Sequence, residues 1–164
     1  PLLASQNGSK SAIGIDAEEN YINHANEVKA KWIEMGLIKD NISFQCGNVL
    51  DCIKSLLPNV DIIVFLRVLY HIRSEDAKTE ESYLNGITYL FDEIKSSGDK
   101  ILIMQGNPGR KHLSKQFKNN CGNNLAITEN MEKLALDYDF IPFSMKGEIV
   151  VAVSKNHSDG EILF

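Results

Sequence analysis

Acidic, amide, basic and imidazole side chains follow three short apolar runs of this sequence, each where the run ends. Asp16 ends SAIGID, Asn48 lies within CGNVLD just after a second run, and Arg67 and His71 follow VDIIVFL. A carboxylate at a strand end can bind ribose hydroxyls, an amide offers a donor and an acceptor to a base, and an imidazole exchanges protons near neutral pH. The pattern indicates a nucleotide site beside a group that can accept a proton.

Each of these residues also has a purely structural explanation, and the sequence alone leaves both open. Asp16 and Glu19 have the D-x-x-E spacing of a capping box that opens a helix. Residues 47–49 can form an ordinary turn, although small and amide residues there let a planar base approach. His71 can begin a helix without any part in catalysis.

The run that positions Arg67 and His71 is the most apolar stretch of the chain. All residues from Ile62 to Leu66 are apolar, so the run lacks the alternation of apolar and polar residues that a half-exposed strand shows. It is also too short and too rich in β-branched residues for a buried helix, which predicts a strand covered on both faces. We therefore expect Val60 to Leu66 to be among the most buried strands, in the middle of a parallel sheet. Ligand crevices of such sheets lie outside the carboxyl ends of the strands.

Further strands and helices alternate around this run. The spacing of Tyr21, Ala25, Val28, Trp32 and Met35 predicts a helix with one buried face. The pattern predicts a fold of class α/β: a Rossmann-like, mostly parallel twisted sheet with helices on both faces and a C-terminal antiparallel hairpin. The expected strands are 11–16, 42–45, 60–66, 100–105, 140–144 and 148–153, and the expected helices are 1–7, 17–36, 51–57, 79–97 and 128–137.

Composition narrows the class of protein further. The chain of 164 residues has 17 basic and 22 acidic residues and a net charge of −5, so nucleic acid is not the expected partner. Three cysteines without a C-x-x-C pair favour a reduced, cytoplasmic protein with no metal site, and no run is long enough to span a membrane. We expect a single domain at 1–156 with a tail at 157–164, and the sequence leaves a homo-oligomer open.

Four motifs in order resemble class I S-adenosylmethionine-dependent methyltransferases, in particular their small-molecule branch. The motifs are GID at 14–16, CGNVLD at 46–51, VLYHI at 68–72 and IKSSGDKILI at 94–103, and the resemblance covers Ser11 to about Ser154. It implies an enzyme that uses S-adenosylmethionine to methylate a small-molecule acceptor. Asp16 and Ala17 would then hold the ribose, Gly47, Asn48 and Val49 would flank the adenine, and Arg67 would line the pocket through its backbone. His71 would be the general base if the acceptor must lose a proton.

The family's first strand and glycine-rich loop have no counterpart in this sequence, so we expect an N-terminally incomplete domain. That strand sits in the family between the strands predicted at 11–16 and 60–66. Two apolar strand edges are therefore expected to lack a neighbour, and such edges readily pair with other chains.

The sequence also indicates the chemical class of the methyl acceptor and leaves two other functions open. Arg110 to Asn124 is rich in Arg, Lys and His, so it is either a solvated helix face or a lid over an acceptor that carries a carboxylate or phosphate. A nicotinamide-dependent oxidoreductase would also end its second strand on an acidic residue. A non-catalytic Rossmann-like binding module is the alternative from another class.

Overall fold

The computed structural model describes residues 1–74, 79–106, 127–146 and 148–155. The chain divides into two compact units, Pro1–Cys52 and Ile53–Phe164, and each is described by itself. Whether 1–156 forms one domain stays a prediction. The expectations for the loop and basic run at 107–124 and for the tail at 157–164 lie outside the described residues.

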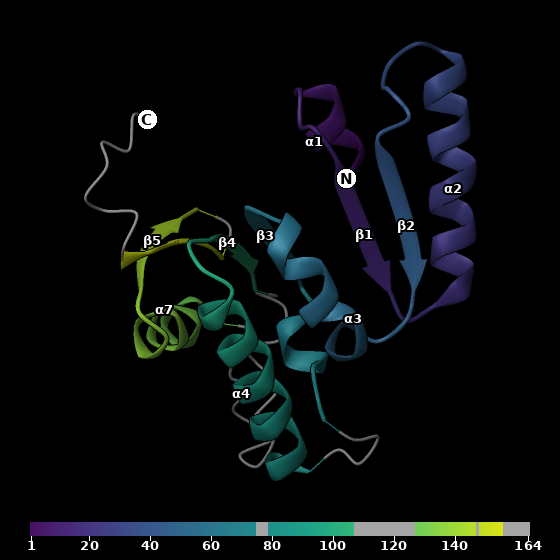
Figure 1. The fold of residues 1–164 in the computed structure, drawn as a ribbon. Helices are drawn as coiled ribbons and strands as arrows, with labels where there is room; N and C mark the ends of the chain where they lie inside the picture. The colour runs from purple at the N-terminus through teal and green to yellow at the C-terminus, as the bar shows by residue number, and fades with distance from the viewer. Residues whose placement is uncertain (75–78, 107–126, 147, 156–164) are drawn as a thin grey trace. The chain divides into compact units, whose positions relative to one another are not determined.

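The first unit is a pair of parallel strands with two helices (Figure 1). Ala12 pairs with Ile42 and Asp16 with Cys46, so both strands end at the same level. The apolar turn and glycine at the start of the chain form the predicted helix end, because Gly8 has φ 89° and Ser9 N–H donates to the Ala4 carbonyl at 3.0 Å. The elements are α1 Leu2–Gln6, β1 Ala12–Asp16, α2 Glu19–Glu34 and β2 Ile42–Cys46.

Helix α3 (Val49–Leu56) leads into the second unit, a four-stranded sheet in the order β3-β4-β6-β5 (Figure 1). Strands β3 and β4 are parallel, whereas β6 runs antiparallel to both β4 and β5. The remaining elements are η1 Leu57–Asn59, β3 Ile62–Leu66, η2 Leu69–His71, α4 Glu80–Ser96, β4 Ile101–Gln105, α7 Thr128–Asp137, β5 Phe140–Met145 and β6 Ile149–Ser154. The predicted fold class is confirmed: a mixed α/β fold with parallel pairing and a C-terminal antiparallel hairpin.

The core of the second unit lies between the sheet and α4. The predicted face of α4, from Tyr83 through Ile87 and Leu90 to Ile94, is buried. Phe91 stacks on Phe65 of β3 with ring centroids 6.3 Å apart and contacts Tyr138 at 5.2 Å. The helix period of the sequence therefore identified the right face, because one apolar stripe packs against one sheet face.

The expected burial of β3 in the middle of the sheet is wrong. Strand β3 is the end strand of its sheet, and its exposure alternates, with Ile63 and Phe65 buried and Ile62, Val64 and Leu66 exposed. The physical reason is that β3 pairs with β4 alone among the described strands, and only the face that carries Ile63 and Phe65 packs into the core of the second unit. Likewise, β1 pairs with β2 and with no other described strand, and the two expected open edges stay a prediction.

The predicted stripe of α2 is correct only in its middle. Ala25, Val28 and Trp32 are partly covered, but Tyr21 is 66% exposed and Met35 is 60% exposed. The buried residue of this helix is Ile22, which shifts the covered face away from Tyr21. Strands β1 and β2 have five residues each and are shorter than a helix of 16 residues, so apolar side chains at both ends of α2 stay exposed.

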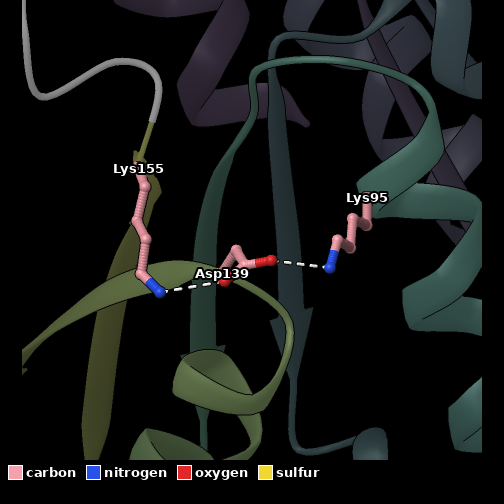
Figure 2. Close-up of polar contacts among 3 residues, drawn as sticks. All are labelled: Lys95, Asp139 and Lys155. Carbon is pink, nitrogen blue, oxygen red and sulfur yellow. Dashed lines mark hydrogen bonds and ion pairs between the residues drawn. The ribbon is translucent and has the colours of Figure 1, made fainter.

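An exposed cluster of three charged residues joins the end of α4 to the hairpin. Figure 2 shows Asp139 between Lys95 and Lys155, whose Nζ atoms lie 2.6 Å and 2.9 Å from its carboxylate oxygens. The hydrogen bond from Lys95, followed by the one from Lys155, lowers the pKa of Asp139 from 3.8 to about 2. Asp139 precedes Phe140, which pairs with Ser154 at the end of β6, and the end of β6 pairs with the start of β4. The cluster therefore lies at the end of the sheet where β4 begins. Arg67 follows the end of β3, which is parallel to β4, so Arg67 lies at the opposite end of the sheet.

Candidate functional site

Five of the predicted cofactor residues lie together where β1 and β2 end. We call these residues, Asp16, Ala17, Gly47, Asn48 and Val49, the first rim. The parallel register brings Asp16 beside Cys46, and Gly47 N–H donates to the Asp16 carbonyl at 2.9 Å. Two residues that are 31 positions apart in sequence are therefore joined by a backbone hydrogen bond, because parallel strands end at the same edge of a sheet.

Asp16 adopts a local turn and does not cap a helix. Its Oδ1 atom accepts a hydrogen bond from Glu18 N–H at 2.9 Å, while helix α2 begins at Glu19 with Glu18 as its N-cap residue. The D-x-x-E capping box is therefore wrong, because a capping residue must directly precede the first helical residue. In the described part of the chain, Oδ2 of Asp16 makes no hydrogen bond, and the side chain is partly exposed.

The turn after β2 presents backbone and one amide side chain. Gly47 has φ 157°, a conformation that residues with a Cβ atom rarely adopt, and a Cβ atom added there would meet nothing within 4 Å. Asn48 Oδ1 accepts a hydrogen bond from Leu50 N–H at 3.1 Å, which is the usual bond at the start of a helix. The oxygen of Asn48 is thus engaged, while its Nδ2 atom makes no hydrogen bond to any described residue and keeps two N–H donors.

One neighbour on the first rim was not identified from the sequence. The Sγ atom of Cys46 lies 3.6 Å from the Ala17 carbonyl, so it joins the residue after β1 to the end of β2. The sequence indicated only the position of Cys46, which directly precedes Gly47 at the end of an apolar run. Pairing of Cys46 with Asp16 could not be inferred without the register of the two strands.

Arg67 and His71 lie in the second unit, where β3 ends. Arg67 has φ 58°, which a non-glycine residue adopts only at a cost of about 1–3 kcal/mol, and its N–H donates to the Gln105 carbonyl at 3.0 Å. Strained backbone of this kind gathers at binding sites, and here it turns the chain sharply after β3. His71 ends the short helix η2, its N–H donates to the Val68 carbonyl at 2.8 Å, and its side chain is exposed.

The second unit also contains a hollow of about 430 Å³ beside α4 and α7. Its lining includes Ile87, Thr88, Asp92 and Leu134, and none of the predicted site residues contributes to it. Within the described ranges, no group of three or more His, Cys, Asp or Glu side chains could hold a metal ion. No described helix has the length and apolar character that crossing a bilayer requires.

Comparison with solved structures shows a likeness in fold. No family model matches the sequence, and no curated protein does. The fold is similar to that of the N-methyltransferase NodS from Bradyrhizobium japonicum WM9, with 13% sequence identity, 93% of this chain and 89% of that chain covered, and a TM-score of 0.48.

Proposed function

We propose that this chain binds S-adenosylmethionine and transfers its methyl group to a small-molecule acceptor. The observation that carries the proposal is the first rim, where a carboxylate and an amide lie beside a side-chain-free turn at the ends of two parallel strands. An adenosine needs these three features: an acceptor for its ribose hydroxyls, a donor for its base and a backbone that a flat ring can approach.

The proposal assigns one part of an adenosine to each residue of the first rim. Asp16 holds one oxygen in its own turn, which fixes the carboxylate, and leaves Oδ2 for the ribose hydroxyls. Asn48 holds its oxygen at the start of α3 and leaves its Nδ2 donors for a base nitrogen. Ala17 and Val49 are assigned to the two sides of the adenosine, and Gly47 adds no side chain there.

The family resemblance implies the remaining roles, which we propose for Arg67 and His71. Arg67 contributes backbone at the strained turn after β3, and His71 accepts the acceptor's proton where the reaction releases one. S-adenosylmethionine supplies a sulfonium methyl that is displaced in line, so the protein's part is to hold the acceptor atom at near-attack distance. No nucleophilic side chain of the chain is required by this chemistry.

The class of the acceptor comes from the basic run at Arg110 to Asn124, outside the described residues. Arg and Lys there favour an acceptor with a carboxylate or phosphate, because these groups form charge-assisted hydrogen bonds with cations. A cytoplasmic location stays a prediction from cysteine usage.

Thermal shift measurements with two ligands separate the proposal from its alternatives. We expect S-adenosylhomocysteine to raise the melting temperature of the chain, because a ligand that binds only the native state stabilises it, and NAD to leave it unchanged. A shift with NAD alone would identify a nicotinamide-dependent oxidoreductase, since Asp16 suits either ribose. No shift with either ligand would favour a non-catalytic module.

A further inference from the structure

The hollow beside α4 and α7 is apolar in one half. Ile87 of α4 is buried, Leu84 of the same helix is 61% exposed, and Leu134 of α7 completes this half. The C-terminal ends of the two helices lie together, because Lys95 in the last turn of α4 binds Asp139, which follows the end of α7. The three apolar residues precede these ends, so they share the half of the hollow that is farther from the helix ends.

The other half of the hollow, where both helices end, is acidic. Asp92 of α4 and Asp137 of α7 line it, and neither carboxylate forms a hydrogen bond or ion pair with another residue in the part of the chain that the structure describes. Lys95 also lines this half, but its Nζ atom lies 2.6 Å from Oδ2 of Asp139, as Figure 2 shows. The pKa of Lys95 is raised mainly by this hydrogen bond, and Asp92 contributes less. The carboxylates of Asp92 and Asp137 are therefore accessible to a cation from outside the chain.

The end of α7 carries a charge that is unfavourable for the helix itself. The C-terminus of a helix has a partial negative charge of about half a unit, which favours cations in the last turn. Helix α7 has no basic residue in its last turn and ends on Asp137 instead. A cation bound between Asp137 and Asp92 would offset the carboxylates and the helix end together, so this arrangement points to a ligand.

The hollow has the size of a site for a small molecule. Its volume of about 430 Å³ lies within the range of about 300–1,000 Å³ that such sites occupy. Eight described residues line it, whereas a stable protein interface uses about 20–30 residues from each partner. A divalent metal ion needs more ligands than two carboxylates, and the described ranges hold no larger group of metal-binding side chains. These observations favour a small organic cation.

We infer that this hollow binds a protonated amine that is joined to an apolar ring or chain. The ammonium group donates to the carboxylates of Asp92 and Asp137, and the apolar part lies against the three apolar side chains of the other half, which removes apolar surface from water. The acidic half lies at the end of the sheet where β4 begins, opposite the end that carries Arg67. The site is therefore separate from the acceptor site proposed above, and the inference does not depend on methyl transfer.

Titration of the full chain with three probes at pH 7, followed by NMR, tests the class of ligand. Phenethylamine carries a ring and a positive charge, phenethyl alcohol carries the ring alone, and ethylamine carries the charge alone. We expect phenethylamine to shift the amide signals of Leu84, Thr88 and Leu134 saturably, with a Kd below about 1 mM and at least about tenfold below that of either other probe. No saturable binding, equal binding of the three probes, or shifts confined to other residues would overturn the inference.

A double substitution tests the two carboxylates. We expect Asp92→Asn combined with Asp137→Asn to raise the Kd of phenethylamine at least about fivefold, because two exposed ion pairs, each individually weak, are lost. The matched control is Glu34→Gln, which removes an exposed carboxylate of the first unit and should leave the Kd unchanged. An unchanged Kd in the double variant, or an equal rise in the control, would contradict the proposed site.

The melting temperature of Asp137→Asn without ligand separates binding from stability. We expect it to rise by about 1–4 °C, because the amide removes an unfavourable charge from the end of α7. A variant that melts higher and binds phenethylamine more weakly is the result that the inference predicts. A lower melting temperature with an unchanged Kd would show that Asp137 stabilises the helix end, and the inference would be wrong.

Discussion

The first unit buries few large side chains, whereas the second contains most of the core. Ile22, Ile38 and Ile42 are the buried isoleucines of the first unit, while side chains such as Leu90 and Phe91 of the second unit are fully inaccessible. The first unit nevertheless carries five of the six residues proposed to bind the cofactor. Stability and the proposed chemistry are thus concentrated in different units, and substitutions in each should change different measured quantities.

The largest expected difference is between two aromatic residues. Phe91→Ala should lower the free energy of unfolding by about 3–5 kcal/mol, because Phe91 is fully buried between Phe65 and Tyr138. Tyr21→Ala in the first unit should change it by less than about 0.5 kcal/mol, since Tyr21 is exposed. Urea unfolding followed by circular dichroism measures both, and equal losses would contradict the unequal division of the core.

Gly86 provides a second test in the core of the second unit. A Cβ atom at Gly86 would lie 2.7 Å from backbone atoms of Arg73, so Gly86→Ala should destabilise the chain by about 1–3 kcal/mol. In an ordinary helix the same change stabilises, because alanine favours helix more than glycine does. Asn85→Ala, at the neighbouring exposed position of α4, is the control and should be neutral or stabilising. A stabilised Gly86→Ala variant would show that the segment at Arg73 moves away at no cost.

A smaller effect is expected from the exposed charges around Asp139. Because the folded pKa of Asp139, about 2, lies below 3.8, its contribution to stability is present above about pH 4 and is lost as the pH falls from 3.8 towards 2. Asp139→Asn should therefore be less stable than the original chain at pH 6, and the difference should shrink as the pH approaches 3. Asparagine also tolerates the φ of 65° at this position, so the variant tests charge alone. Urea unfolding at several pH values measures this, and a difference that is constant between pH 6 and pH 3 would rule out the ion pairs as its cause.

The elements were predictable from the sequence because they depend on local periodicity. The face of α4 from Tyr83 to Ile94 and the hairpin at β5 and β6 follow directly from the positions of apolar residues. The edge position of β3 could not be read from its residues, since β3 (IIVFL) and β4 (ILIMQ) are equally continuous. Leu102 and Met104 of β4 are buried on the same face as Ile63 and Phe65, and the two strands differ in that β4 also pairs with β6, which comes from a distant part of the chain.

The candidate site was predictable in position but not in detail. Parallel strands place Asp16 and Gly47 at one edge of a sheet, which the order of elements already implied. The turn at Asp16 differs from the expected cap because helix α2 starts at Glu19, and helix starts are only weakly encoded. The contact of Cys46 with Ala17 depends on strand register, which the pattern of apolar residues leaves undetermined here.

The proposal that the first rim binds adenosine is tested most directly by calorimetric titration of S-adenosylhomocysteine into the Asp16→Ala variant. We expect affinity to fall by about ten- to 150-fold, which corresponds to the loss of about 1.5–3 kcal/mol from charge-assisted hydrogen bonds, with only a small change in melting temperature. The control is Glu19→Ala, which removes an exposed carboxylate three positions away and should leave affinity unchanged. Unchanged affinity in the Asp16→Ala variant, together with a lowered melting temperature, would show that Asp16 serves only the local turn and would contradict the account.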